Sequence, residues 1–186
     1  MTDALVRKLT TSLQKGSLSD RVARERATKR RFLVLDCSGS MAEHCEPGRA
    51  KIDALREIVT ALRAEDVPFR QIVFGGCGAQ LMDTIPDPCG GMPMAEALAM
   101  ASQHQAERVV IISDGIPDDE TEAAKEAKQI RCPVDIFYVG PRPHPGEAFL
   151  RSLAKSSGGL YQETTLTRDG TKALAAQTKA RLALPR

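Results

Sequence analysis

The chain alternates between short runs of apolar residues and longer segments in which apolar residues recur every three or four positions. Short runs bounded by Gly, Ser or Pro predict buried strands, whereas the helical spacing predicts amphipathic helices. The predicted strands are a run that begins at residue 31, followed by residues 71–74, 80–82, 109–113, 134–139 and 160–162. The predicted helices are residues 52–64, a helix that begins near Pro93, and residues 120–129, 146–155 and 168–182.

The order of these elements predicts the fold class. Alternating strands and helices are typical of an α/β fold with a doubly wound, mostly parallel central sheet and helices on both faces. Residues 71–74 and 80–82 are joined across Gly75-Gly76-Cys77-Gly78, which predicts a hairpin. We therefore expect its second strand to lie antiparallel at one edge of the sheet.

Polar side chains follow the first predicted strand at alternating positions. The segment Arg31–Met41 runs from apolar residues into Asp36, Ser38 and Ser40, in the pattern Asp-x-Ser-x-Ser. Residues that follow a strand of an open α/β sheet lie at its carboxyl edge, where such folds bind ligands. Carboxylate and hydroxyl oxygens suit a hard divalent cation such as Mg²⁺ or Mn²⁺ better than they suit zinc. The motif therefore predicts a cation site at this edge.

The motif resembles the first metal loop of the von Willebrand factor A (vWA) family, whose metal site is a metal-ion-dependent adhesion site. Two later segments resemble that family in the same order: Gly90–Leu98 is similar to its middle loop, and Ile111–Gly115 to the strand that ends in an Asp at the metal. Residues 149–161 are also similar to the family's penultimate helix and last strand. The resemblance covers roughly residues 31–183 and is to intracellular bacterial members.

The resemblance implies a set of metal ligands. In the family, two serines and a threonine of the middle loop donate oxygens to Mg²⁺, two aspartates act directly or through water, and an acidic residue of the partner completes the shell. The positions that match are Asp36, Ser38, Ser40 and Asp114, but Met92 stands at the threonine position. A thioether is a weak ligand for a hard ion, so one oxygen is lost or replaced by water.

The same resemblance implies a non-enzymatic protein-interaction module. A cation held mainly by neutral hydroxyls keeps residual positive charge, and an Asp or Glu of a partner protein can occupy its open position. Met92, Arg142 and His144 are expected at the rim that meets this partner. Intracellular bacterial relatives work with AAA+ ATPases of the MoxR type or with metal chelatase assemblies, so the resemblance implies a partner of that class.

The composition fits one domain of this kind. The chain has 186 residues, of which 42% are hydrophobic, but only 4% are aromatic and none is Trp, which disfavours base stacking with nucleic acid. No apolar run approaches the roughly 18 to 20 residues that span a bilayer, and residues 1–7 show no signal-peptide pattern. We therefore expect a cytoplasmic protein with no membrane partner. The five cysteines, an odd number, are expected to be reduced thiols.

The charge is concentrated at the start of the chain. Residues 1–31 carry nine basic and three acidic side chains, although the formal net charge of the chain is only +2. Leu5, Leu9 and Leu13 recur at helical spacing. We expect residues 1–30 to form a basic helical extension and residues 31–186 to form the vWA-like domain.

Two other functions stay open, and neither requires a metal ion. In one, the chain is a metal-free scaffold or oligomerisation domain, and Asp36 and Ser40 merely bond the loop backbone. In the other, the basic extension makes it a nucleic-acid-associated protein. Patterns of common enzymes are missing: the chain has no Gly-x-Ser-x-Gly or Gly-x-Gly-x-x-Gly, and Ser38 stands where a haloacid-dehalogenase-like phosphatase needs a second Asp.

Overall fold

The computed structural model describes residues 22, 25, 30–141, 143 and 146–184. Its main sheet has six strands in the order β5-β4-β1-β6-β7-β8. The strands are β1 (Arg31–Asp36), β4 (Arg70–Gly75), β5 (Gly78–Leu81), β6 (Arg108–Ser113), β7 (Val134–Tyr138) and β8 (Tyr161–Glu163). Only the β4–β5 pair is antiparallel in this sheet, with β5 at the edge. The predicted fold class is therefore confirmed.

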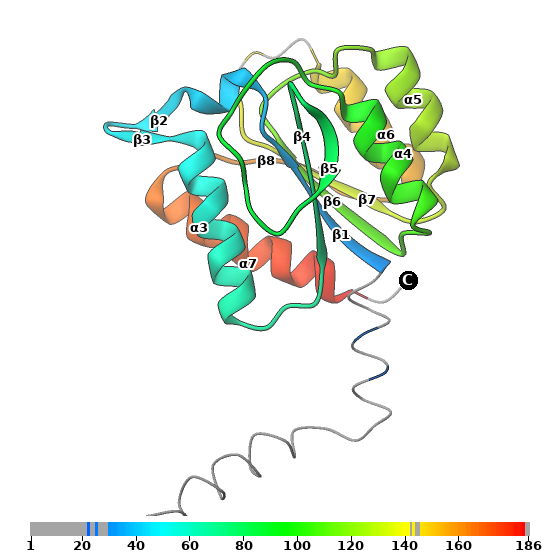
Figure 1. Ribbon diagram of the computed structural model, residues 1–186, viewed down its shortest axis with the longest axis horizontal. Helices are drawn as coiled ribbons and strands as arrows, with labels where there is room; N and C mark the ends of the chain where they lie inside the picture. The colour runs from blue at the N-terminus through cyan, green and yellow to red at the C-terminus, as the bar shows by residue number, and fades with distance from the viewer. Residues whose placement is uncertain (1–21, 23–24, 26–29, 142, 144–145, 185–186) are drawn as a thin grey trace, which may run out of the picture.

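Helices cover both faces of the sheet (Figure 1). One face carries α3 (Lys51–Ala64) and α7 (Arg168–Ala183), and the other carries α4 (Met94–Gln103), α5 (Glu120–Gln129) and α6 (Glu147–Ser157). Alternate residues of β1 divide between two buried clusters: Phe32 and Val34 pack on the α4–α6 side, whereas Leu33 and Leu35 pack on the α3–α7 side. Because side chains alternate across a strand, one continuous apolar run supplies both cores.

The predicted helix and strand segments between residues 31 and 183 are present, within a few residues of the expected ends. Two elements between β1 and α3 were not predicted: the short 3₁₀ helix η1 (Gly39–Ala42) and the hairpin of β2 (His44–Glu46) and β3 (Arg49–Ala50). Polar contacts hold the hairpin, since the Arg49 guanidinium donates to the Glu57 carboxylate at 2.6 Å and to the Leu166 carbonyl at 2.6 Å. Its sequence therefore shows no apolar periodicity.

A buried group of ion pairs lies near the start of β6 and β7. The Asp135 carboxylate, near the start of β7, accepts hydrogen bonds from Arg108 of β6 at 3.1 Å and from the Leu160 backbone at 2.8 Å, and it pairs with Arg181 of α7. These contacts fix β7 and α7 to the core.

The predicted basic extension, residues 1–30, lies almost wholly outside the described residues. All five cysteines are free thiols, with Cys37 and Cys132 buried and Cys77 and Cys89 exposed. Within the described part of the chain, none of the helices has the length and apolar character needed to cross a membrane.

Candidate functional site

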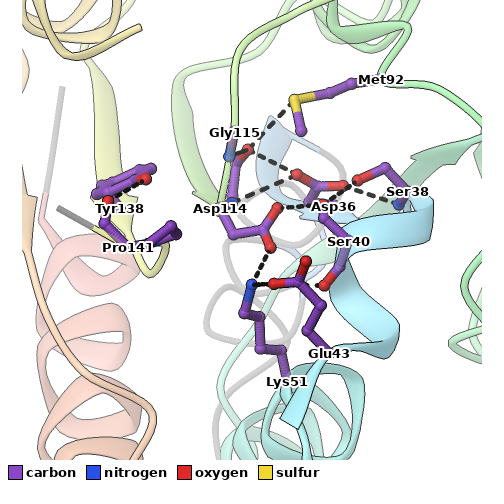
Figure 2. A network of polar contacts seen from close by, with 11 residues as sticks. Asp36, Ser38, Ser40, Glu43, Lys51, Met92, Asp114, Gly115, Tyr138 and Pro141 are labelled. Atoms are coloured by element: carbon purple, nitrogen blue, oxygen red, sulfur yellow. Dashed lines mark hydrogen bonds and ion pairs between the residues drawn. The ribbon is translucent and has the colours of Figure 1, made fainter. Parts of the chain in front are cut away.

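The two predicted aspartates lie at neighbouring strand ends (Figure 2). Asp36 is the last residue of β1, and Asp114 directly follows β6, which pairs with β1 in parallel. Ser38 and Ser40 lie in the loop and 3₁₀ helix that follow β1. The three residues of the motif and Asp114 thus come together at the carboxyl edge of the sheet.

Asp36 is wholly buried, and hydrogen bonds fix both of its carboxylate oxygens. Oδ1 accepts from the Ser38 backbone N–H at 2.8 Å, and Oδ2 accepts from the Ser113 hydroxyl at 2.7 Å. Burial raises the pKa of Asp36 above its ordinary value, while the hydrogen bonds from Ser38 and Ser113 act in the opposite direction. The carboxylate therefore has one orientation, toward the motif loop and the end of β6.

A chain of short contacts joins the two serines to Asp114. The Ser38 and Ser40 hydroxyl oxygens are 3.1 Å apart, and the Ser40 hydroxyl donates to Asp114 Oδ1 at 2.7 Å. Ser38 is 3% exposed and Asp114 is 5% exposed. The site is thus a compact group of two hydroxyls and two carboxylates, of which Ser40 is the partly exposed member.

Lys51 also enters the site, and the sequence reasoning missed it. Its ammonium donates to Asp114 Oδ2 at 2.6 Å and to the Glu43 carboxylate at 2.7 Å, and the Lys51 side chain is only 8% exposed. Burial tends to lower the pKa of Lys51, but the hydrogen bonds to Asp114 and Glu43 outweigh it and raise the pKa. The ammonium is therefore a fixed positive charge beside Asp114.

One sequence signal could have found Lys51. It is the first residue of α3 and lies four, seven and eleven positions before the buried residues Leu55, Ile58 and Leu62. That spacing places it on the apolar stripe of the helix. A lysine on such a stripe needs a buried anionic partner, and Asp114 is that partner.

Two solved structures share this architecture. An aerotolerance-related membrane protein from Bacteroides fragilis NCTC 9343, crystallised with multiple mutations to serines, has a TM-score of 0.58 and 16% sequence identity, over 82% of this chain and 98% of that chain. The manganese-loaded TRAP protein of Plasmodium vivax has a TM-score of 0.59 and 16% identity, over 84% of this chain and 74% of that chain. This chain has a vWA-like fold. No family model and no curated protein sequence matches it.

Within this vWA-like fold, the middle loop brings Met92 to the site. The Met92 sulfur lies 3.6 Å from the Ser113 hydroxyl, and its side chain packs in the core cluster of the α4 face. At 6% exposure, Met92 offers almost no surface to a partner. The other two expected rim residues, Arg142 and His144, lie outside the described residues.

Asp118 and Asp119 have structural partners in the vWA-like domain. The Asp118 carboxylate accepts from the Met92 backbone N–H at 2.8 Å and so holds the middle loop in place. A Cβ at Gly91 would lie 2.5 Å from that carboxylate, so a larger residue at Gly91 would displace the Asp118 side chain. Asp119 caps α5 by accepting from the Glu122 backbone N–H at 2.9 Å.

The side chains at this edge of the sheet suit a hard divalent cation by ligand type. Asp36 and Asp114 supply anionic oxygens, and Ser38 and Ser40 supply neutral ones. The side chains of Ser38, Ser40 and Asp114 lie in contact, and the Asp36 carboxylate accepts from the backbone N–H groups of Ser38 and Asp114. The middle loop contributes the Met92 sulfur, which is a weak ligand for such an ion. Among the described residues, no group of three or more His, Cys, Asp and Glu side chains is placed to hold a metal ion.

Proposed function

We propose that this chain is a non-enzymatic protein-interaction module. Its adhesion site would hold Mg²⁺ or Mn²⁺ at Asp36, Ser38, Ser40 and Asp114 and would bind an Asp or Glu side chain of a partner protein. The observation that carries this proposal is the convergence of four oxygen-bearing side chains, from the ends of β1 and β6 and the loop after β1, on one compact site.

The residues support this role by their charges. Bound there, the cation would supply a Lewis-acidic position for an incoming carboxylate. Ser38 and Ser40 are neutral, and the Lys51 ammonium balances Asp114, so Asp36 is the one uncompensated carboxylate among the proposed ligands. This charge balance favours an anionic partner group over a neutral one.

The partner class follows from the sequence resemblance. We propose an acidic surface on an AAA+ ATPase of the MoxR type or on a chelatase-like assembly, and a cytoplasmic location for the complex. The manganese named for the Plasmodium vivax TRAP structure supports the choice of a divalent cation.

One observation favours a second candidate, a metal-free scaffold. The Lys51 ammonium already neutralises Asp114, and Met92 provides no oxygen. The charge of Asp114 is therefore compensated without a metal ion. In that case the same rim would bind partners through its loops alone.

Capture of partners from an extract of the source cells separates the two. Immobilised protein would be tested in Mg²⁺, in excess chelator, and as the double variant Asp36→Ala, Ser38→Ala. The matched control is Ser152→Ala, Asp169→Ala, which changes the same residue types at exposed positions of α6 and α7. We expect partners that are lost on chelation and in the site variant but kept by the control variant. Partners that survive chelation and both variants would favour the scaffold.

A further inference from the structure

The position of Lys51 is unfavourable for a lysine in two respects. Its side chain is 8% exposed, although lysine is among the residues least often buried. It is also the first residue of α3, where the helix dipole favours anions rather than cations. The contacts of Lys51 must offset the cost of burying its charge and of placing it at the start of a helix. These contacts therefore indicate the role of the charge.

Those contacts all lie in the adhesion site. The three N–H groups of the ammonium have three acceptors: Asp114 Oδ2 at 2.6 Å, Glu43 Oε2 at 2.7 Å and the Ser40 carbonyl at 3.4 Å. Figure 2 shows Lys51 approaching Asp114 from the side opposite Met92, with Glu43 beside it. Asp114 uses its other oxygen to accept from Ser40, so Lys51 fixes the orientation of Asp114 as well as its charge.

The two acidic partners of Lys51 differ in burial. The Asp114 side chain is 1% exposed, whereas the Glu43 side chain is 64% exposed. Coulomb interactions are strong in the interior and weak in water, so the charge of Lys51 acts mainly on Asp114. Glu43 draws off part of this charge and can be changed with little effect on the core.

We infer that Lys51 is the residue that sets the charge of the adhesion site. By neutralising Asp114, it weakens the hold of the site on a divalent cation and leaves the bound cation more positive toward a partner's carboxylate. Lys51 thus lowers the affinity of the site for the cation and raises the affinity of the bound cation for a partner's carboxylate. This inference rests on the proposed function, and it deepens that proposal by naming a positioning residue that is not itself a metal ligand.

Mn²⁺ titration of the full chain, followed by the paramagnetic resonance of free Mn²⁺, tests the inference. We expect Lys51→Met to bind Mn²⁺ about tenfold more tightly than the wild type, because a positive charge beside the cation is lost. Acetate, the carboxylate probe, should then bind the Mn²⁺-loaded variant more weakly, as measured by the relaxation of water protons. Without metal, the variant should melt at a lower temperature, because Asp114 is left buried and unpaired, and Mn²⁺ should restore most of the loss.

Two further variants make the test selective. Glu43→Gln removes a negative charge and should shift Mn²⁺ affinity the other way, to about twofold weaker. Lys179→Met removes a lysine that pairs with Glu65, just beyond the far end of α3, and should leave Mn²⁺ affinity unchanged. If Lys51→Met fails to fold, the change in Mn²⁺ affinity of Glu43→Gln tests the inference instead.

The outcomes separate the inference from the proposed function. Mn²⁺ uptake with equal affinity by the wild type, Lys51→Met and Glu43→Gln would overturn the inference and leave the proposed function standing. Absence of Mn²⁺ uptake by every protein would contradict the proposed function itself.

Discussion

The Ser113 hydroxyl donates a hydrogen bond of 2.7 Å to Asp36 Oδ2, which joins the last residue of β6 to the last residue of β1. Ser113 lies outside the Asp-x-Ser-x-Ser motif, yet it fixes the orientation of the Asp36 carboxylate in that motif. The same hydroxyl contacts the Met92 sulfur, so one side chain links all three segments of the site.

Replacing Ser113 by Ala should weaken both the fold and the site. The loss of the hydrogen bond leaves a buried carboxylate oxygen with only a long contact to the Asp114 backbone, at 3.4 Å. We expect a fall of about 1 to 2 kcal/mol in the free energy of unfolding, measured by urea denaturation. The control Ser102→Ala removes a surface hydroxyl on α4 and should change it by less than about 0.5 kcal/mol. Equal effects of the two variants would contradict the role of Ser113.

Asp36→Asn should stabilise the protein at neutral pH while it removes a metal ligand. Burial raises the pKa of Asp36 above 3.8, so the folded state binds the proton more tightly than the unfolded chain does. The free energy of unfolding therefore falls as pH rises above about 3.8, which is a penalty for ionising the buried carboxyl group. The neutral amide removes this penalty and keeps the shape.

Urea denaturation of Asp36→Asn between pH 4 and pH 8 checks this sign. We expect a higher unfolding midpoint than that of the wild type at pH 7 and a weaker dependence on pH, together with a loss of Mn²⁺ binding. The exposed Asp169→Asn serves as the charge-matched control. A variant that is less stable than the wild type at pH 7 would show that Asp36 stabilises the fold as an anion.

Met92→Thr tests whether the missing oxygen limits the cation site. Thr and Val have the same shape, so the difference between Met92→Thr and Met92→Val isolates the hydroxyl. We expect Mn²⁺ to bind the Thr variant about tenfold more tightly than the Val variant, because an oxygen suits the hard ion. Both should lose about 1 to 3 kcal/mol of stability, since the Met92 side chain fills the core. Equal Mn²⁺ affinities would place the middle loop outside the metal shell.

Cysteine alkylation reports on the motif loop. Burial, assisted by the neighbouring Asp36 charge, raises the pKa of Cys37 from 9.0 to about 12. Its thiolate is thus depleted about a thousandfold at pH 8 relative to the unfolded chain. We expect iodoacetamide to modify the exposed Cys77 and Cys89 and to spare Cys37 until urea unfolds the protein, as mass spectrometry of the peptides can follow. Modification of Cys37 at the rate of Cys77 would indicate that the loop opens in the native state.

Sequence patterns predicted the fold where burial is regular. The runs at Phe32–Leu35 and Val109–Ile112 are buried on both sides of the sheet, so their apolar character is continuous and easily recognised. The hairpin at His44–Ala50 was missed because arginine and glutamate contacts hold it, and these leave no periodic apolar signal.

The candidate site could be predicted only in part, for a related reason. Asp36, Ser38, Ser40 and Asp114 follow apolar strands, and parallel strands bring their carboxyl ends to one edge. Lys51 and Ser113 reach the site through three-dimensional packing. Lys51 extends from α3, and Ser113 is the polar last residue of β6, where it follows four buried apolar residues. The loop pattern alone cannot indicate such neighbours.

The most direct measurement of the central claim is an anomalous difference map from crystals of the wild-type protein grown with Mn²⁺. We expect one peak in contact with the Ser38 and Ser40 hydroxyls, beside Asp36 and Asp114, with Lys51 still paired to Asp114. A map with no anomalous density at that position, in crystals that diffract well enough to show the two serine side chains, would contradict the adhesion mechanism.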